Sequence, residues 1–391
     1  MLHYGRHWID DDDIQAVVDV LKSGPLTQGP KIGEFEAKFS KYVGARFAVA
    51  VSNGTSALHI ACLAAGIGPG HTVITSPNTF VASANCVIYT GGRPAFSDID
   101  PVTLNIKAET IEKECKRLSN VKAIIPVHFG GLSCEMPKIW SVAQKVGATI
   151  IEDACHALGG NYSDGSRIGS CRFSQMAVFS LHPVKSITSG EGGVVTTNDE
   201  KLYRQLLRLR GHGINKLDDP YIYPEEAYTE GKRNDWYYEM QQLGFNYRIS
   251  DIQCALAIAQ LDKLDKFIAL RREIAGFYDR EFKTLKHAKR TQVSGRNDSA
   301  NHLYVLRFDY DAIGLSRRQL FELLAARGIV GHAHYIPVPM HPYYRTHYPV
   351  PPENYAQALA YYREALSLPL YPSMSDKDVT AVVKAVWELI G

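Results

Sequence analysis

The stretch Thr149-Ile-Ile-Glu-Asp153-Ala-Cys-His156 decides how this sequence folds. A short apolar run that ends in an acidic residue is typical of a buried strand with a polar group at its carboxyl end. Similar runs, separated by longer helical patterns, recur between about residues 46 and 200. The predicted strands are residues 47–51, 72–76, 94–99, 122–127, 149–153, 175–180 and 194–197. This alternation predicts an α/β fold with a mostly parallel sheet and helices on both faces.

Helical patterns organise the rest of the chain. They cover residues 56–65, 81–89, 137–146, 199–209, 252–282, 316–327, 355–366 and 376–389, with one more strand at 302–309. Residues 214–240 are polar and aromatic without a clear period, so we expect a long loop with a functional or interface role. A chain of 391 residues exceeds the usual size of one domain. We predict a large domain over residues 1–250 and a smaller C-terminal domain over 251–391.

A second informative stretch is Ser180-Leu-His-Pro-Val-Lys185-Ser-Ile-Thr-Ser-Gly-Glu191-Gly-Gly193, a Gly/Ser-rich turn between two predicted strands. Pyridoxal phosphate (PLP) requires an amine to bind its aldehyde and a carboxylate beside its ring nitrogen. Asp153 ends a predicted central strand, where open α/β sheets bind ligands. Burial would lower the pKa of Lys185 from the ordinary value of about 10.4 and free its amine to react. Lys185 and Asp153 together predict a PLP site.

Other segments contain side chains that could contact the ring, the phenolic oxygen and the phosphate of this cofactor. His156 could hydrogen-bond its phenolic oxygen, and Phe80 opens a predicted helix where an aromatic ring could stack on the cofactor. The segment Val51-Ser-Asn-Gly54-Thr55-Ser-Ala-Leu predicts a strand, a small-residue turn and a helix. Free N–H groups at such a helix start bind anions, so the turn is a candidate phosphate site. Ser180 could donate a further hydrogen bond to the same phosphate.

Each of these residues also has a purely structural interpretation. Asp153 and the turn after residue 51 are both consistent with simple helix caps. Lys185 alone is typical of a solvated turn lysine, and single aromatic or histidine residues more often pack in a core. The acidic run at residues 10–13 precedes a helical apolar spacing, so we assign it to a helix N-terminus. A metal-binding motif of a glycosyltransferase is the alternative for that run, and we expect no metal.

Composition narrows the class of protein. The chain has 43 Lys and Arg against 41 Asp and Glu, a net charge of +2, and no long basic run, so we expect no nucleic-acid partner. The 7 cysteines are scattered without a CxxC spacing and are interpreted as reduced thiols. Neither a signal-peptide pattern nor a membrane-length apolar run is present. We therefore expect a cytoplasmic protein with no membrane association.

In combination, these motifs resemble the PLP-dependent nucleotide-sugar aminotransferases of the DegT/StrS type. The resemblance extends over essentially the whole chain. It rests on residues 23–30, 52–57, 76–82, 152–159, 179–193, 243–248 and 253–256. It implies the aspartate-aminotransferase fold, in which a large domain with a mixed, mostly parallel sheet is joined to a smaller C-terminal α+β domain.

The same resemblance implies roles for individual residues. Lys185 binds the cofactor aldehyde and Asp153 faces the ring nitrogen, while Phe80 and His156 pack around the ring. Gly54, Thr55 and Ser180 hold the phosphate. Asn246 matches a family residue that reaches the phosphate from the partner subunit, which implies a homodimer with shared active sites. Some members replace the lysine and perform deoxygenation, so the retained Lys185 favours amino transfer.

Within the family, the chain is most similar to the C4 aminotransferases of pseudaminic acid biosynthesis. Tyr4, residues 24–27 and the loop at 334–338 match their substrate-contacting stretches. The candidate contact residues are Tyr4, Gly24, Pro25, Leu26, Thr27, Tyr335, Ile336, Pro337 and Val338. The implied reaction aminates a UDP-linked 4-keto-6-deoxy-N-acetylhexosamine with L-glutamate as donor. Ile336 is a departure, because some relatives carry lysine there.

Other functions remain open from the sequence. An aminotransferase or dehydratase acting on a different nucleotide ketosugar would use the same residues. A non-catalytic PLP-binding regulator would bind the cofactor without turnover, and glutamate would leave that cofactor unchanged.

Overall fold

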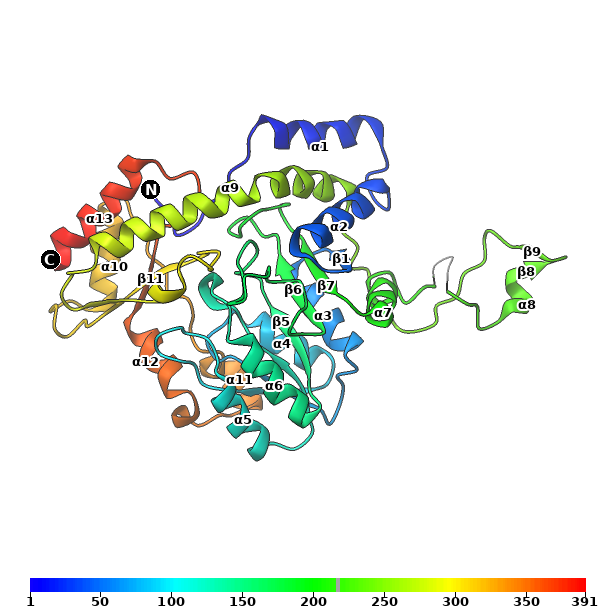
Figure 1. Cartoon of the computed structure of the whole chain (residues 1–391), viewed down its shortest axis with the longest axis horizontal. Coiled ribbons are helices and arrows are strands. Elements are labelled where there is room, and N and C mark those ends of the chain that lie inside the picture. Colours follow the sequence, from blue (N-terminus) through cyan, green and yellow to red (C-terminus); the bar gives the residue numbers. More distant parts are fainter. Residues whose placement is uncertain (216–218) are drawn as a thin grey trace.

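The computed structural model describes residues 1–215 and 219–391 (Figure 1). Its centre is a seven-stranded sheet in the order β1-β7-β6-β5-β4-β2-β3. These strands are β1 (Phe47–Val51), β2 (Thr72–Thr75), β3 (Arg93–Phe96), β4 (Val121–Ile125), β5 (Thr149–Asp153), β6 (Met176–Ser180) and β7 (Gly193–Thr197). The neighbours from β6 through β5, β4 and β2 to β3 are parallel, while β7 is antiparallel to β1 and to β6. The predicted mixed, mostly parallel sheet is confirmed.

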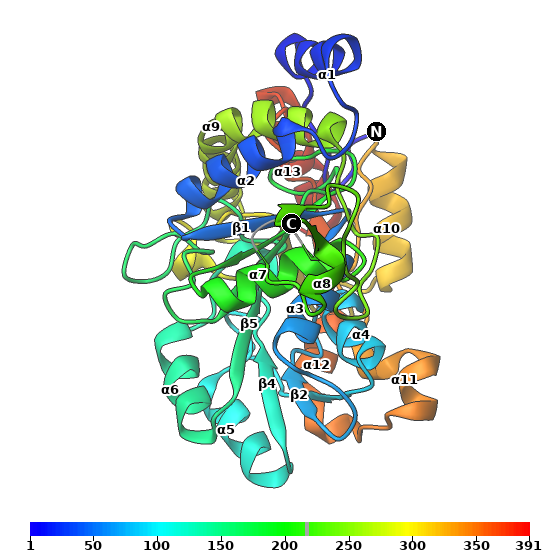
Figure 2. The same cartoon turned by 90° about the vertical axis from the view of Figure 1, so that its right-hand side faces the viewer.

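Helices cover both faces of this sheet (Figures 1 and 2). One face packs against α2 (Pro30–Val43), α5 (Ala108–Arg117) and α6 (Met136–Val146), and the other against α3 (Gly54–Ala64), α4 (Ala82–Tyr89) and α7 (Glu200–Arg210). Strand side chains alternate between faces, so each strand contributes to two cores. In β1, Ala48 and Ala50 join the first core, while Val49 and Val51 join the second.

The helix α9 (Asp251–Glu281) runs from the large sheet to a second, smaller core (Figure 1). That core contains a three-stranded antiparallel sheet and two helices. They are β10 (Ala288–Arg290), β11 (Tyr304–Phe308), β12 (Ala365–Leu368), α10 (Arg317–Ala326) and α13 (Asp376–Ile390). The first core also includes residues from both sides of position 250, so the domain boundary stays a prediction.

Short elements connect these parts. They are η1 (Phe129–Gly131), η2 (Val293–Gly295), η3 (Val338–Met340), α11 (Pro342–His347), η4 (Pro352–Tyr355) and α12 (Ala356–Glu364). The predicted helix at 355–366 is wrong at its end, because the chain leaves α12 at Glu364 and becomes β12. Pairing with β11 buries all four residues of β12, and this tertiary contact overrides the local helical pattern.

The acidic run forms the start of α1 (Asp11–Ser23), as predicted. Asp10 and Asp13 make a reciprocal capping box around the first turn. Asp13 is fully buried, lies 3.0 Å from Lys263 Nζ and accepts a 2.7 Å hydrogen bond from Gln260. The acids therefore also anchor α1 on α9, a contact that the local pattern did not predict.

The predicted long loop at 214–240 projects from the body beyond α7 (Figure 1). Residues 216–218 of this prediction lie outside the described residues. We call residues 219–243 the arm. It is largely irregular and contains α8 (Pro224–Ala227) and a hairpin of β8 (Tyr228–Thr229) and β9 (Lys232–Arg233). Among the described residues, no helix has the length and apolarity needed to cross a lipid bilayer.

Candidate active site

A cavity of about 770 Å³ opens at the carboxyl edge of β5 and β6. Because β5 and β6 are parallel, Asp153 and Ser180 reach the same edge of the sheet. The turn with Lys185 then joins β6 to its antiparallel neighbour β7. Nine of the predicted site residues line this cavity, namely Tyr4, Gly54, Thr55, Phe80, Asp153, His156, Ser180, Lys185 and Tyr335. Segments far apart in the sequence thus converge on one site.

The Asp153 carboxylate is held by a short hydrogen-bonded chain. Ser83, which is fully buried on α4, donates from Oγ to Asp153 Oδ2 at 2.6 Å. Thr79 Oγ1 lies 2.7 Å from the same Ser83 oxygen, and the Cys155 N–H donates to Asp153 Oδ1 at 3.2 Å. The two donors engage different oxygens of the same carboxylate. The arrangement therefore holds an oriented carboxylate at the cavity floor.

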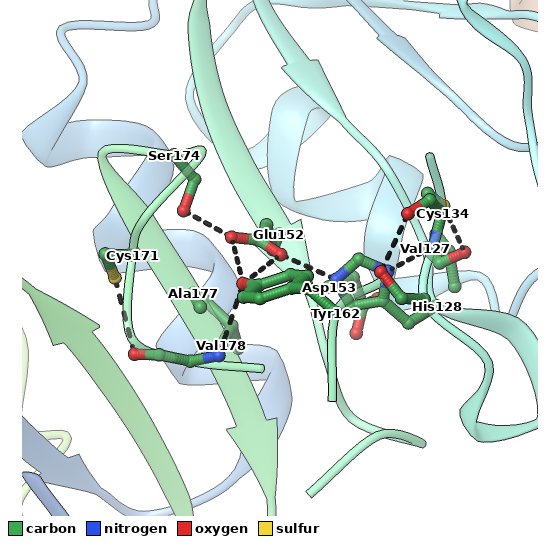
Figure 3. Close-up of polar contacts among 12 residues, drawn as sticks. Val127, His128, Cys134, Glu152, Asp153, Tyr162, Cys171, Ser174, Ala177 and Val178 are labelled. Atoms are coloured by element: carbon green, nitrogen blue, oxygen red, sulfur yellow. Dashed lines mark hydrogen bonds and ion pairs between the residues drawn. The ribbon is translucent and has the colours of Figure 1, made fainter. Parts of the chain in front are cut away.

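Glu152, the preceding residue of β5, anchors the strand from the opposite face (Figure 3). Its fully buried carboxylate accepts hydrogen bonds from His128 Nε2 at 2.6 Å and from Tyr162 Oη at 2.7 Å, and a further one from Ser174 Oγ. A buried charge is tolerated when donors surround it. These contacts fix the end of β5 and, with it, the position of Asp153.

Lys185 is half-buried, and among the described residues no hydrogen bond or ion pair engages its Nζ. Burial lowers the pKa of this amine, while the nearby Cys155 and Asp153 partly oppose the shift. A larger fraction of the amine is therefore neutral, and nucleophilic, than for a lysine in water.

The start of α3 forms a cradle beside Ser180. The Asn53 side chain accepts from Ser56 N at 2.8 Å and caps the helix, and no described group bonds the N–H of Gly54 or Thr55. A Cβ at position 54 would lie 2.9 Å from Ser180 Cβ, so only glycine permits this close approach. The two free N–H groups, the positive helix end and the Ser180 hydroxyl are the groups that a phosphate requires.

A second polar pair forms the opposite wall. Gly130 donates its N–H to His156 Nδ1 at 3.4 Å, and His156 Nε2 lies 3.1 Å from Tyr335 Oη. Burial, with the charge of Lys185 and neighbouring His334, holds the pKa of His156 well below its ordinary value, so the ring is neutral. Nε2 then carries the hydrogen and donates it to Tyr335, which leaves the tyrosine hydroxyl free to donate to another group.

Several residues around the cavity were not predicted. Thr79 and Ser83 hold Asp153, while His59, Tyr247 and His332 line the wall. Ser83 lies seventy positions before Asp153 in the sequence. Of these residues, His332 alone had a short-range signal, because it forms a His-x-His pattern with His334 at the start of the predicted loop at 334–338.

Eight predicted residues do not line the cavity of the same chain. They are Gly24, Pro25, Leu26, Thr27, Asn246, Ile336, Pro337 and Val338. Val338 is fully buried in a small core with Ala84, Phe96 and Tyr344, so in this chain it serves packing. Leu26 and Thr27 pair with Asp251 and Ser250 at the start of α9.

Comparison with known proteins decides the family. Residues 7–387 match the DegT/DnrJ/EryC1/StrS aminotransferase family. This chain belongs to that family. Over its full length it is 40% identical to the spore coat polysaccharide biosynthesis protein SpsC of Bacillus subtilis, of which the match covers 97%. It is thus a PLP-dependent sugar aminotransferase, as predicted.

Solved structures of aminotransferases support this assignment. Helicobacter pylori PseC, an aminotransferase involved in the biosynthesis of pseudoaminic acid, matches with a TM-score of 0.89 and 29% identity, covering 100% of this chain and 99% of PseC. The PLP-form of the putative sugar aminotransferase Spr1654 from Streptococcus pneumoniae matches with a TM-score of 0.87 and 26% identity, covering 99% of both chains. Spr1654 has also been solved in a PMP-form.

The residues of this family member fit the cofactor. The amine of Lys185, the fixed carboxylate of Asp153 and the glycine-lined cradle at α3 match the aldehyde, ring nitrogen and phosphate of PLP in charge and hydrogen-bonding type. The individual roles of the nine lining residues stay predictions.

Proposed function

We propose that this enzyme transfers the amino group of L-glutamate to C4 of a UDP-linked 4-keto-6-deoxy-N-acetylhexosamine. The product would be UDP-4-amino-4,6-dideoxy-N-acetyl-β-L-altrosamine, on the route to pseudaminic acid. The observation that carries amino transfer is the convergence of Lys185 and Asp153 on one cavity. The choice of sugar rests on the full-length similarity to PseC.

PLP supplies an aldehyde that takes up the amino group and a ring that accepts electrons. Asp153 presents its negative charge to the ring nitrogen, held by Ser83 and Cys155. Lys185 Nζ would accept the proton from the glutamate α-carbon, hold it as an ammonium and release it again, and would deliver a proton to C4 of the sugar in the second half of the reaction. His156 orients Tyr335, whose hydroxyl hydrogen remains available to an oxygen of cofactor or substrate.

The scarcity of cationic side chains in the cavity supports an active site that two subunits share. Among the described lining residues, Lys185 is the one lysine or arginine. A nucleotide sugar has no α-carboxylate and must be recognised through its diphosphate and uridine. Some relatives carry a lysine where this chain has Ile336, whose side chain is 43% exposed. Cationic contacts for the diphosphate must therefore come from elsewhere, and a second copy of the chain is the proposed source.

The eight predicted residues outside the cavity support the same homodimer. Asn246 is exposed and lies just before α9, and Leu26 and Thr27 pair with the first residues of that helix. These two segments thus lie at one end of α9. We propose that this surface faces the partner, where Asn246 reaches the phosphate in the partner's cavity. The scattered free thiols favour a reducing compartment, the cytoplasm.

A second candidate is amination of a different nucleotide ketosugar for a surface polysaccharide. The observation that favours it is the 40% identity to SpsC, against 29% for PseC. The lining residues are compatible with either sugar.

Two measurements, made one after the other, test the proposal. The first is the visible absorbance of the purified enzyme before and after addition of L-glutamate. We expect a yellow band that fades with L-glutamate and persists with D-glutamate. A band that L-glutamate leaves unchanged would contradict glutamate as the donor and favour a non-catalytic regulator.

The second measurement supplies a panel of UDP- and dTDP-linked 4-ketosugars to the glutamate-treated enzyme. The expected result is return of the yellow band with UDP-4-keto-6-deoxy-N-acetylhexosamine, and NMR of the product should place nitrogen at C4. Return of the band with a different sugar alone would select the second candidate.

A further inference from the structure

Arg271, on α9, is a buried cation that the reaction does not use. Its side chain is 1% exposed, and Nη1 donates to Leu370 O at 2.8 Å. Nε and Nη2 have no hydrogen-bond partner among the described residues. Burial lowers the pKa of this guanidinium to about 10, with no carboxylate acting on it. A guanidinium that is buried and charged at neutral pH, with no carboxylate beside it, destabilises the fold unless another group compensates its charge.

A small cavity lies beside Arg271, behind the turn that carries Lys185. The N-terminal segment, α9 and the lysine turn line it, and its lining includes the exposed Arg6 together with Trp8, Lys185, Ser186, Thr188 and the buried Arg271. No aspartate or glutamate is among the lining residues in the described part of the chain. Asp13, which is bonded to the lining residue Gln260, shares Lys263 with Asp10 in an ion-pair cluster between α1 and α9. Arg271 therefore has no counter-charge among the described residues that line this cavity.

The size of this cavity limits what can fill it. It offers about 10 Å³ to the centre of a water-sized sphere, which is the room of about one such sphere. A single water would satisfy hydrogen bonds and leave the positive charge uncompensated, whereas a monatomic anion of similar size would do both.

We propose that a chloride-like monovalent anion occupies this cavity, held by Nε and Nη2 of Arg271. The anion ties the N-terminal segment to α9 and to the back of the lysine turn. The site lies behind the cofactor cavity, with which it shares the lining residue Lys185, and it does not depend on which sugar the enzyme aminates.

The test uses crystals of the PLP-bound enzyme prepared in bromide, whose anomalous scattering identifies it, and matched crystals in gluconate, which is too large for the cavity. We expect a bromide peak next to Arg271 Nε and Nη2. We also expect the melting temperature to be higher in bromide by roughly 1–2 °C at equal ionic strength.

Arg271→Met should abolish both effects, while Arg280→Met, an exposed position on the same helix, should keep them. Should Arg271→Met fail to fold, Arg271→Lys and the wild-type bromide crystals decide the question. Water density in place of bromide, with equal melting in both salts, would overturn the proposal.

Discussion

The floor of the cavity and the arm both contain carboxylates that accept several hydrogen bonds. They differ in their surfaces, because the floor is polar and the outer side of the arm is apolar. At the floor, Asp153 and Glu152 are buried and each accepts several hydrogen bonds. In the arm, Glu239 likewise accepts from the N–H groups of Ile222 and Tyr223 at 2.7 and 2.8 Å. The outer side of the arm is nevertheless apolar and exposed. Its exposed large side chains are Ile222, Tyr223, Tyr228, Trp236, Tyr238, Met240 and Leu243.

This difference indicates which parts of the active site can be formed by a single chain. Reactive groups at the floor are positioned by contacts within the chain and need no partner. The arm holds a defined shape through Glu239 but leaves these large apolar side chains exposed, which is typical of a surface prepared for association. We infer that the reaction chemistry is built in the monomer and that substrate recognition is completed by the dimer.

The largest effect should follow Lys185→Ala. Removal of the amine should lower turnover by more than about 1,000-fold, because proton transfer and cofactor attachment both depend on it. The exposed Lys201→Ala serves as the matched control and should retain activity. Circular dichroism should show both variants folded. Substantial turnover by Lys185→Ala would remove this residue from the reaction.

A smaller effect is expected for Ser83→Ala, which deletes the 2.6 Å hydrogen bond to Asp153. A hydrogen bond to a charged group contributes about 1.5–3 kcal/mol, so turnover should fall roughly 10- to 100-fold. PLP dissociation, followed by absorbance, should become faster in parallel. Ser40→Ala, on an exposed face of α2, is the control. Unchanged turnover and cofactor retention would mean that Cys155 alone orients the carboxylate.

The arm is tested by Trp236→Ser and Leu243→Ser, at positions that are both 77% exposed. Burial of a large apolar side chain contributes about 1.5–3 kcal/mol, so each change should raise the dimer dissociation constant about tenfold or more. Analytical ultracentrifugation measures this constant. Val102→Ser, exposed on a loop after β3, should leave it unchanged. Equal constants for all variants would refute the arm as a dimer contact.

The smallest effect concerns the pH dependence of stability. Burial holds the pKa of His302 well below its ordinary value, so between the two values the unfolded chain binds more protons. The free energy of unfolding should therefore decrease as pH falls below about 6.5, by at most about 1.4 kcal/mol per pH unit for this residue. His302→Gln should flatten that slope in urea unfolding, while the exposed His347→Gln should not. Parallel slopes for wild type and His302→Gln would contradict the assignment.

Local signals in the sequence were sufficient for the large sheet. Its strands are continuous apolar runs bounded by turns, so β1 and β5 were predicted to the residue. Helix α2 was missed although Phe35, Phe39 and Val43 recur every four residues, the spacing of an apolar helix face. The strand β12 could not be found this way, since its partner β11 lies about 60 residues earlier.

The position of Lys185 and Asp153 at one cavity could be predicted for a related reason. Asp153 ends one recognisable strand and Lys185 follows another, and their residue types are those that PLP needs. Ser83 and Tyr335 were harder, because their contacts with Asp153 and His156 join segments 70 and 179 positions apart. The position of a residue at a strand end or in a turn can be predicted from the local sequence. Its orientation by a residue that is distant in the sequence can be seen only in the folded structure.

The length of helix α9 limits where residues can be inserted in this chain. It is a continuous 31-residue helix whose first half packs on α1 and α2 and whose second half enters the smaller core. One residue inserted in its middle would rotate everything beyond it by about 100° relative to the cavity. Insertions in the hairpin of the arm impose no such rotation on the body. The arm can therefore diverge in length among relatives, while α9 must keep its phase.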